Sequence, residues 1–169
     1  MKNDLIFKKG NERELDKIFD VFRGAVDSMI ENKIMQWDEI YPCKSDIAND
    51  LRNMQLYVGM IEQEIAVVYA LSKEYEEQYK NGKWELSDEN FIVVHRLCVD
   101  SKFQHRKIGA DTLAYIEKQV RRENVTSIRL DVFSKNPFAL RMYEKAGYHI
   151  VGEVNWRKGM FYLMEKILK

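Results

Sequence analysis

The stretch Phe91–Val120, FIVVHRLCVDSKFQHRKIGADTLAYIEKQV, decides the fold. Its first nine residues are mostly apolar and predict a buried strand. A polar, basic loop follows over residues 100–110. Beyond the loop, apolar residues recur at three- and four-residue spacing and predict an amphipathic helix: Leu113, Ile116 and Val120. We therefore expect a strand, a basic loop and a helix.

The basic loop precedes the predicted helix, where unpaired backbone N–H groups and the helix dipole favour an anion. Gly109 has no Cβ, so the backbone there can approach a ligand closely. Arg106 and Lys107 add positive charge. These features predict that a phosphate-bearing ligand binds residues 104–110. The alternative is an ordinary turn, since neither Gly-x-Gly-x-x-Gly nor Gly-x-x-x-x-Gly-Lys-Ser/Thr occurs here.

The loop resembles the acetyl-CoA loop of the GCN5-related N-acetyltransferase (GNAT) family. That family's pattern is Gln/Arg-x-x-Gly-x-Gly/Ala, and it follows an apolar strand. Gln104 and Gly109 match the ends of the pattern, whereas Lys107 stands where the family usually has its first glycine.

A second motif extends the resemblance. The family recurrently shows Asn-x-x-Ala-x-x-x-Tyr-x-x-x-Gly-Phe/Tyr after the next strand. Every position is matched here, by Asn136, Ala139, Tyr143, Gly147 and Tyr148. Two motifs in this order are more specific than either motif alone.

The resemblance implies a cofactor and its binding residues. Acetyl-CoA would lie between two diverging parallel strands that end near Val99 and Phe133, and backbone groups of Leu97 and Val99 would hold its pantetheine arm. Amides of residues 105–110 would hold the pyrophosphate. The implied cofactor contacts are Leu97, Cys98, Val99, Gln104, His105, Arg106, Lys107, Ile108, Gly109, Ala110, Asn136 and Tyr143. No metal is expected.

The resemblance also implies catalytic residues. Tyr143 holds the position from which a neutral hydroxyl, of ordinary pKa ~10, donates to the departing sulfur; the alternative is a core tyrosine. Asp131 matches an acidic position that some protein N-terminal acetyltransferases of the family use as a base. His95 is the second candidate base, because histidine titrates near neutrality. Structural alternatives are an Asp131–arginine pair and a merely packed or exposed His95.

The remaining patterns predict seven strands and four helices in the order strand, two helices, three strands, helix, strand, helix, two strands. With the resemblance, this indicates an α/β (α+β) acyl-CoA N-acyltransferase fold: a mixed, mostly antiparallel twisted sheet of about seven strands, flanked by four helices. The central strand–helix–strand unit is expected to be a parallel crossover. Residues 1–169 are expected to form a single domain.

Residues 72–90 form a long connection for a compact domain. Long connections are often binding loops or lids, and Tyr75 and Trp84 are candidates to line an acceptor pocket. The alternative is an exposed insertion whose aromatic residues pack on a sheet edge. The resemblance places acceptor specificity near the last predicted hairpin, at Glu153, Trp156 and Arg157.

Composition narrows the class of protein. Lys+Arg and Asp+Glu are both 27, so a nucleic-acid partner is disfavoured. No apolar run reaches the ~18 residues that span a bilayer, and no signal peptide is recognisable. Cys43 and Cys98 lie in no paired motif, which suggests reduced thiols and a cytoplasmic protein.

Together these features predict an N-acetyltransferase that moves an acetyl group from acetyl-CoA to a primary amine by direct attack in a ternary complex. The acceptor would be a small molecule, a peptide or a protein. The alternative is a non-catalytic acyl-CoA binding or sensing module of the same fold. A monomer and a homodimer are both compatible with the sequence.

Overall fold

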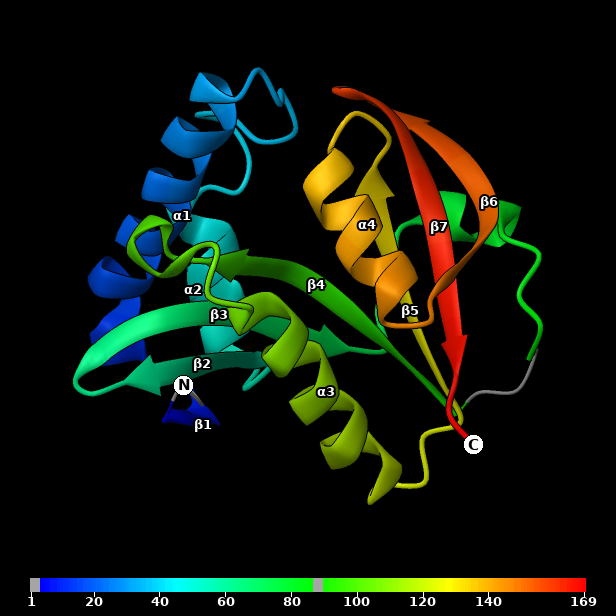
Figure 1. Ribbon diagram of the computed structural model, residues 1–169, viewed down its shortest axis with the longest axis horizontal. Helices are drawn as coiled ribbons and strands as arrows, with labels where there is room; N and C mark the ends of the chain where they lie inside the picture. The colour runs from blue at the N-terminus through cyan, green and yellow to red at the C-terminus, as the bar shows by residue number, and fades with distance from the viewer. Residues whose placement is uncertain (1–3, 87–89) are drawn as a thin grey trace. The chain divides into compact units, whose positions relative to one another are not determined.

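The computed structural model describes residues 4–86 and 90–169, and these contain seven strands and four α-helices (Figure 1). The strands are β1 (Leu5–Lys9), β2 (Leu56–Ile61), β3 (Glu64–Ser72), β4 (Phe91–Val99), β5 (Ser127–Phe133), β6 (His149–Trp156) and β7 (Gly159–Ile167). The α-helices are α1 (Leu15–Glu31), α2 (Lys44–Arg52), α3 (Ile108–Arg121) and α4 (Pro137–Lys145). Short 3₁₀ turns are η1 (Glu12–Glu14), η2 (Glu77–Asn81) and η3 (Ser101–Phe103).

The strands form one sheet in the order β1-β2-β3-β4-β5-β7-β6. β2 pairs antiparallel with β1 and β3, and β7 pairs antiparallel with β5 and β6. β4 and β5 are parallel, and the chain joins them through α3. The predicted fold class, with its mixed sheet, four helices and central parallel crossover, is confirmed.

The described residues divide into two compact units. The first runs up to Leu71 and also includes Arg96–Thr112; the second comprises Ser72–His95 and Leu113–Lys169. The first unit has a core in which α1 and α2 pack their apolar faces with β2 and β3, and its largest fully buried side chains include Ile18, Phe22, Ile47 and Leu56.

Most of the apolar stripe of α1 lies in the core. Ile18 and Phe22 are buried, and Leu15, Phe19, Val26 and Met29 pack against the same cluster. Ile30, in the last turn, is 49% exposed. A capping box precedes α1, in which the Arg13 amide donates to Asn11 Oδ1 and the Asn11 amide donates to Glu14 Oε2.

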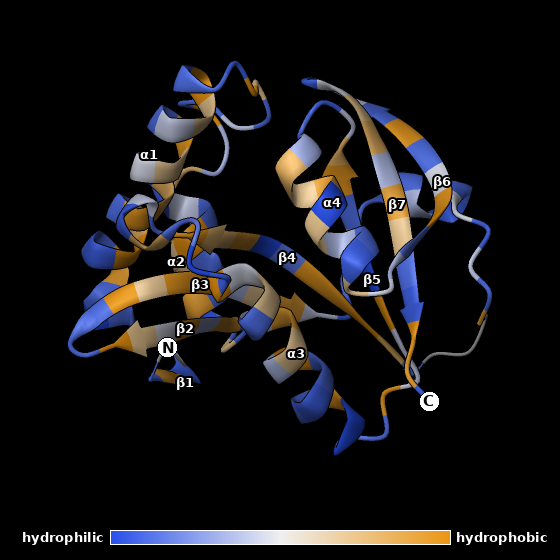
Figure 2. Cartoon of the chain, viewed as in Figure 1, coloured by the Kyte–Doolittle hydropathy of each residue, from blue (hydrophilic) through white to orange (hydrophobic). Residues whose placement is uncertain are grey.

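The loop was predicted to extend to residue 110, but α3 already begins at Ile108. Ile108, Gly109 and Ala110 form its first turn. The Asp111 amide donates to the Lys107 carbonyl at 3.0 Å, and Thr112 Oγ1 donates to the Ile108 carbonyl at 2.7 Å. Burial of the Ile108 side chain, which is 1% exposed, fixes this early start. In Figure 2 the C-terminal end of α3 is hydrophilic, whereas β3 is mainly hydrophobic.

In the second unit, the connection after β3 runs beside β6. The Lys83 amide donates to the carbonyl of Val151 at 2.8 Å, at the point where the β6–β7 register shifts. A Cβ built on Gly152 would lie 3.1 Å from the Asn81 carbonyl oxygen. The absence of a side chain at Gly152 therefore permits this close contact between the connection and the strand.

Candidate functional site

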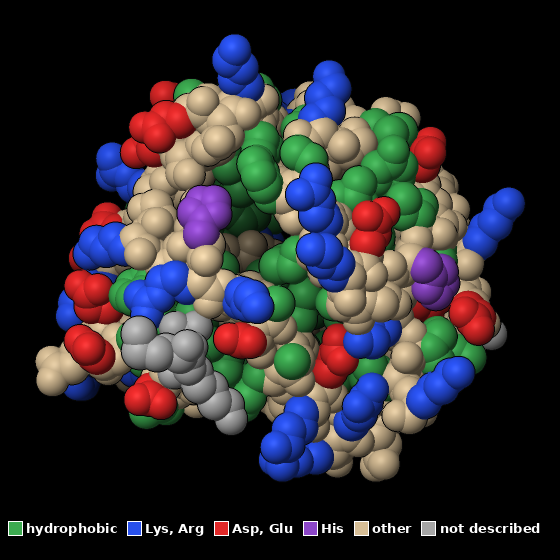
Figure 3. All heavy atoms as spheres, viewed as in Figure 1, with side chains coloured by type: hydrophobic (Ala, Val, Ile, Leu, Met, Phe, Trp, Pro, Cys, Tyr) green, Lys and Arg blue, Asp and Glu red, His purple; other side chains and the backbone are tan. Residues whose placement is uncertain are grey.

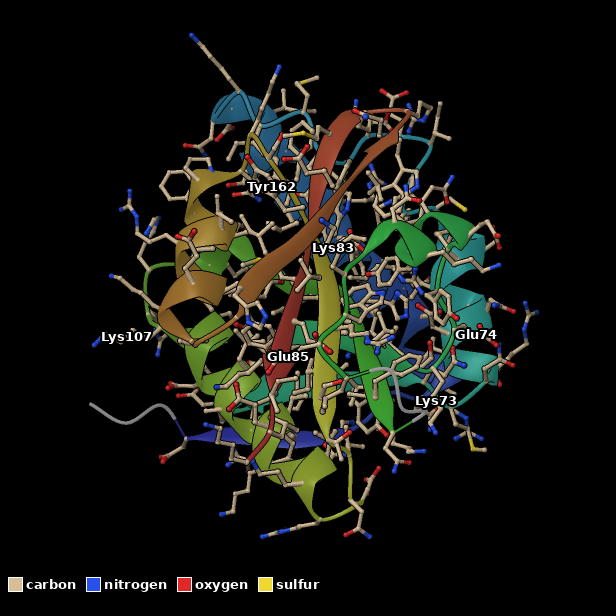
Figure 4. The ribbon with its side chains drawn as sticks, turned by 90° about the vertical axis from the view of Figure 1, so that its right-hand side faces the viewer. Lys73, Glu74, Lys83, Glu85, Lys107 and Tyr162 are labelled. Carbon is tan, nitrogen blue, oxygen red and sulfur yellow. The ribbon has the colours of Figure 1, made fainter. Side chains whose placement is uncertain are left out.

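The segment Gln104–Lys107 has an unusual backbone. His105 and Lys107 have φ angles of 63° and 62°, in the left-handed region that non-glycine residues rarely adopt. A turn with such residues can direct successive N–H groups toward one side, a concave arrangement that binds anions. Lys107 thus adopts the conformation that the family's glycine adopts readily. Its side chain is exposed and extends away from the ribbon (Figure 4).

The N-terminus of α3 adds further donors. The first amides of a helix have no partner within the helix, and here they belong to Ile108, Gly109 and Ala110. On either side of the segment, Phe103 and Ile108 are buried in one cluster. The Arg106 guanidinium lies 5.2 Å from the centre of the Phe103 ring. The segment is thus anchored at both ends and carries exposed positive charge, so its residues fit a diphosphate.

The end of β4 offers its main chain to a ligand more readily than its side chains. Leu97 and Val99 pack against the cluster that contains Phe103 and Ile108. Cys98 points into the α1–α2 core, where Sγ donates to the Val21 carbonyl at 3.9 Å. Burial, together with the charge of Asp100, raises the pKa of the Cys98 thiol well above its usual value. Cys98 can therefore meet a cofactor through its backbone alone.

The parallel strands β4 and β5 pair over a short length. Their register runs from Phe91 opposite Ser127 to Val93 opposite Arg129. Within the described residues that register ends there, although both strands continue. The divergence of the two strands beyond this register remains a prediction.

Tyr143 lies on α4 and is 7% exposed. Its ring meets that of Tyr148 edge to face at a centroid distance of 5.8 Å. Burial raises the pKa of the Tyr143 hydroxyl well above its ordinary value, and the negative charge of Asp131 raises it further. The hydroxyl therefore keeps its proton at neutral pH.

Asn136 caps the helix that carries Tyr143. Its Oδ1 accepts from the Ala139 amide at 3.1 Å, and Pro137 occupies the first helical position. Asn136 is 6% exposed. The capping role is therefore observed, whereas a bond from Asn136 to the cofactor remains a prediction.

Asp131 accepts a hydrogen bond from a tyrosine. Tyr79 in η2 donates its hydroxyl proton to Asp131 Oδ2 at 2.6 Å. Tyr79 is 2% exposed, and its ring stacks on those of Tyr75 and Trp84. The long connection after β3 thus supplies a residue that contacts the leading candidate base. Sequence reasoning noticed the aromatic character of this connection but did not assign Tyr79 a role.

His95 contacts the start of the same connection. Its Nε2 lies 2.9 Å from the Glu74 carbonyl oxygen and 3.1 Å from Ser72 Oγ. Because a carbonyl oxygen only accepts hydrogen bonds, this geometry assigns the proton of a neutral ring to Nε2. If His95 acts as the base, Nδ1 would therefore be the atom that accepts the proton.

A buried pair that the sequence did not reveal holds the connection at residues 84–86. Arg129 Nε lies 3.7 Å from Glu165 Oε1, and their side chains are 7% and 0% exposed. Arg129 also donates to the Leu86 carbonyl at 2.6 Å, while Glu165 Oε2 accepts from the Glu85 amide at 2.7 Å. Glu85 is labelled in Figure 4. Arg129 and Asp131 lie on one face of β5, and the connection contacts both of them there.

The residues considered for acceptor binding fall into two groups, those whose side chains are packed and those whose side chains are accessible. The Trp84 indole N–H donates to the Tyr79 carbonyl at 2.8 Å, and Arg129 lies over the Trp84 ring. Trp156 packs on Tyr79 and Phe161. Tyr75 is 45% exposed, and Glu153 and Arg157 are exposed. Trp84 and Trp156 therefore have packing roles, whereas Tyr75, Glu153 and Arg157 have accessible side chains.

The described residues offer neither a metal site nor a membrane-spanning helix. Residues 4–86 and 90–169 contain no group of three or more His, Cys, Asp or Glu side chains placed to hold a metal ion. In the same part of the chain, no helix has the length and apolar character needed to cross a membrane. On the face shown in Figure 3, charged side chains of both signs are interspersed.

The chain belongs to the acetyltransferase (GNAT) family, whose profile matches residues 25–148. A spermine/spermidine N(1)-acetyltransferase of Bacillus subtilis is 28% identical over 90 residues, which are 53% of this chain and 54% of the relative. The uncharacterized N-acetyltransferase YesJ of the same species is 26% identical over 107 residues, 63% of this chain and 59% of the relative. This chain thus matches little more than half the length of these curated relatives.

Solved structures share the fold over nearly the whole chain. A GNAT-family acetyltransferase from Streptococcus agalactiae superposes with a TM-score of 0.85 at 23% identity, covering 98% of this chain and 96% of that one. The PaiA N-acetyltransferase of Thermoplasma acidophilum, crystallised in complex with coenzyme A, superposes with a TM-score of 0.72 at 17% identity, covering 97% and 99%. At these identities the likeness concerns the fold alone.

Proposed function

We propose that residues 1–169 form a single N-acetyltransferase domain that transfers an acetyl group from acetyl-CoA to a primary amine by direct attack in a ternary complex. Family membership supports acetyl transfer. The segment Gln104–Lys107 and the open amides of α3 fit the diphosphate. Leu97 and Val99 would bind the pantetheine arm through their main chain.

The observation that carries the proposal is the state of Tyr143. A buried hydroxyl with a raised pKa, in the family's motif, is a stable hydrogen-bond donor at neutral pH. A thiol has an ordinary pKa of about 8.5, so a tyrosine with a pKa above 10 is the weaker acid of the two. Tyr143 therefore stabilises charge on the departing sulfur mainly by donating a hydrogen bond, and full proton transfer to the sulfur is uphill.

The acceptor amine must lose a proton as it attacks. Asp131 is the proposed base, because its carboxylate is held in place by Tyr79 and because its charge acts on the Tyr143 hydroxyl. Acetyl-CoA supplies the acetyl group as a thioester. His95 is the second candidate, acting through Nδ1. The pH–rate profiles of Asp131→Asn and His95→Ala distinguish the two candidates. In the variant that lacks the base, the rate no longer rises with pH as the base would lose its proton.

The acceptor is proposed to be an alkyl primary amine, on a small molecule or at a peptide or protein amine. Two of the relatives found by sequence comparison carry names as spermine acetyltransferases, so polyamines head the panel of amines to be tested.

The test is a titration with acetyl-CoA followed by measurement of thiol release with a panel of polyamines, lysine and peptide amines. We expect acetyl-CoA binding and amine-dependent thiol release. Binding without release from any amine would favour the non-catalytic acyl-CoA module. Absence of acetyl-CoA binding would overturn the proposal altogether.

A further inference from the structure

Arg96 has a strained backbone in the middle of β4. Its φ is 52°, in the left-handed region. For a residue with a Cβ this conformation is unfavourable and persists only where the surroundings fix it. Within a strand, such a residue bends the chain and takes the adjoining backbone groups out of the regular ladder. The next residues are Leu97, Cys98 and Val99, the proposed contacts of the pantetheine arm.

The Arg96 side chain is held by a two-pronged bond. Arg96 Nε donates to Asp50 Oδ2 at 2.7 Å, and a terminal nitrogen donates to Asp50 Oδ1 at 2.5 Å. The other terminal nitrogen donates to the Tyr41 hydroxyl at 2.9 Å. A planar guanidinium bound in this way has a fixed orientation. The contact therefore restrains the position of Arg96.

Both partners of Arg96 are themselves anchored within the same compact unit. Asp50 is 3% exposed and lies on α2 between Ile47 and Leu51, which are both core residues. Tyr41 follows a turn in which Asp38 Oδ1 accepts from the Ile40 and Tyr41 amides. The hydrogen bonds from Arg96 to Asp50 and Tyr41, here called the clamp, thus connect β4 to the packed helical layer of that unit.

A buried ion pair is a poor source of net stability, because desolvation of the charges offsets their attraction. Burial does oppose the charge of Arg96, although Tyr41 and Asp50 together outweigh it and raise the pKa of the guanidinium. A role in fixing conformation accounts better for the pair than a role in stability does. The pair fixes the strained backbone of Arg96, which directly precedes residues 97–99.

We propose that Asp50 is a positioning residue for acetyl-CoA: through Arg96 it holds the bend in β4 that presents the backbone of Leu97 and Val99 to the pantetheine arm. The inference rests on the proposed function, because it concerns the binding of that cofactor. It assigns no chemical step to Asp50 or to Arg96.

The decisive comparison is between Arg96→Ala and Arg96→Gly. Both variants lose the clamp, but alanine keeps a Cβ that opposes the left-handed conformation, whereas glycine accepts it. We expect the Kd of coenzyme A, measured by calorimetry, to rise about tenfold in Arg96→Ala and less than about threefold in Arg96→Gly. Equal or weaker binding by the glycine variant would overturn the proposal.

Asp50→Asn provides a second test, because it keeps the shape of the side chain and removes its charge. We expect the KM for acetyl-CoA to rise about fivefold while kcat stays within twofold. The matched control is Glu64→Gln, which alters the exposed Lys102–Glu64 pair of the same unit and should change neither constant. A lower Tm for Asp50→Asn with an unchanged Kd and KM would show a purely structural pair and overturn the proposal.

Failure of this inference is distinguishable from failure of the proposed function. If the wild-type protein binds coenzyme A and all these variants bind it equally well, only the positioning role is lost. If the wild-type protein itself does not bind coenzyme A, the proposed function fails, and this inference fails with it.

Discussion

The segment Gln104–Lys107 and the strand β5 carry different parts of the proposed chemistry, and they are built in opposite ways. The segment has exposed side chains and two left-handed residues, so what it offers a ligand is main chain. β5 is buried on both faces, and its Asp131 carboxylate is fixed by a hydrogen bond from a buried tyrosine. Binding by the segment should therefore depend on backbone conformation, and chemistry at β5 should depend on side-chain identity.

The largest effect is expected from Tyr143→Phe. This change removes one hydroxyl from a buried ring and leaves the packing against Tyr148 intact. We expect kcat to fall about 100-fold, because a donor to the departing sulfur is lost, while the Kd of acetyl-CoA stays within twofold. Steady-state thiol release and calorimetry measure the two quantities. Unchanged turnover would remove Tyr143 from the mechanism.

The next largest effect should come from Lys107, in a comparison of two substitutions. Valine strongly disfavours a positive φ, whereas glycine adopts it readily. Lys107→Val is expected to weaken acetyl-CoA binding about tenfold with little change in kcat. Lys107→Gly, which loses the same charge, should bind within about threefold of the wild type. If the two variants bind equally weakly, charge rather than conformation governs the segment.

Stability at alkaline pH should reveal the buried acids. Burial raises the pKa values of Cys98, Tyr143 and Tyr148 in the folded protein above those of the unfolded chain. The stability that they contribute is therefore complete below the unfolded pKa values of about 8.5–10 and is lost as pH rises further. We expect a loss approaching about 1.4 kcal/mol per pH unit for each group, measured by urea unfolding between pH 8 and 11.

Cys98→Ala separates the thiol from the tyrosines in that experiment. The variant should show a shallower decline between pH 8.5 and 10, because the Cys98 thiol is the first of the three buried groups to titrate in the unfolded chain. Cys43→Ala, at a half-buried thiol near Ser45, is the control. Identical slopes for Cys98→Ala and the wild type would contradict the assignment.

The smallest effect is expected from Tyr79→Phe, which removes the hydrogen bond to Asp131 Oδ2. Loss of a donor disfavours the carboxylate relative to the protonated acid of Asp131. If Asp131 is the base, the acidic limb of the kcat profile moves to higher pH, and kcat falls about threefold at a pH on that limb while it changes little on the plateau. An unmoved limb in Tyr79→Phe would favour His95.

The fold was predictable because local patterns agreed with one another. The strand at 91–99, the capping box at Asn11 and the Asn136-Pro137 helix start each rest on short-range rules, and each is observed. Long-range partners were not predictable in this way. The pairs Asp50–Arg96, Arg129–Glu165 and Tyr79–Asp131 join residues 36 to 52 positions apart, and no local spacing connects such residues.

The candidate site was found through motifs and not through its contacts. The sequence placed Tyr143 and the basic loop by pattern, but it could not show that Lys107 adopts a glycine-like conformation. It also did not identify Tyr79 as a hydrogen-bond partner of Asp131, because that contact depends on the path of the connection after β3 over β5. What a long loop covers depends on its tertiary path, which composition does not encode.

The hydrogen bond from Lys83 to Val151 bears on self-association. β6 is the last strand of the sheet, and an outermost strand offers unpaired main-chain groups as a template for another chain. Here the protein's own residues 81–83 lie against that strand, at a point where Gly152 permits close approach. Strand addition from a second copy would first have to displace them. The close-fitting glycine therefore helps to protect the sheet against edge-to-edge aggregation.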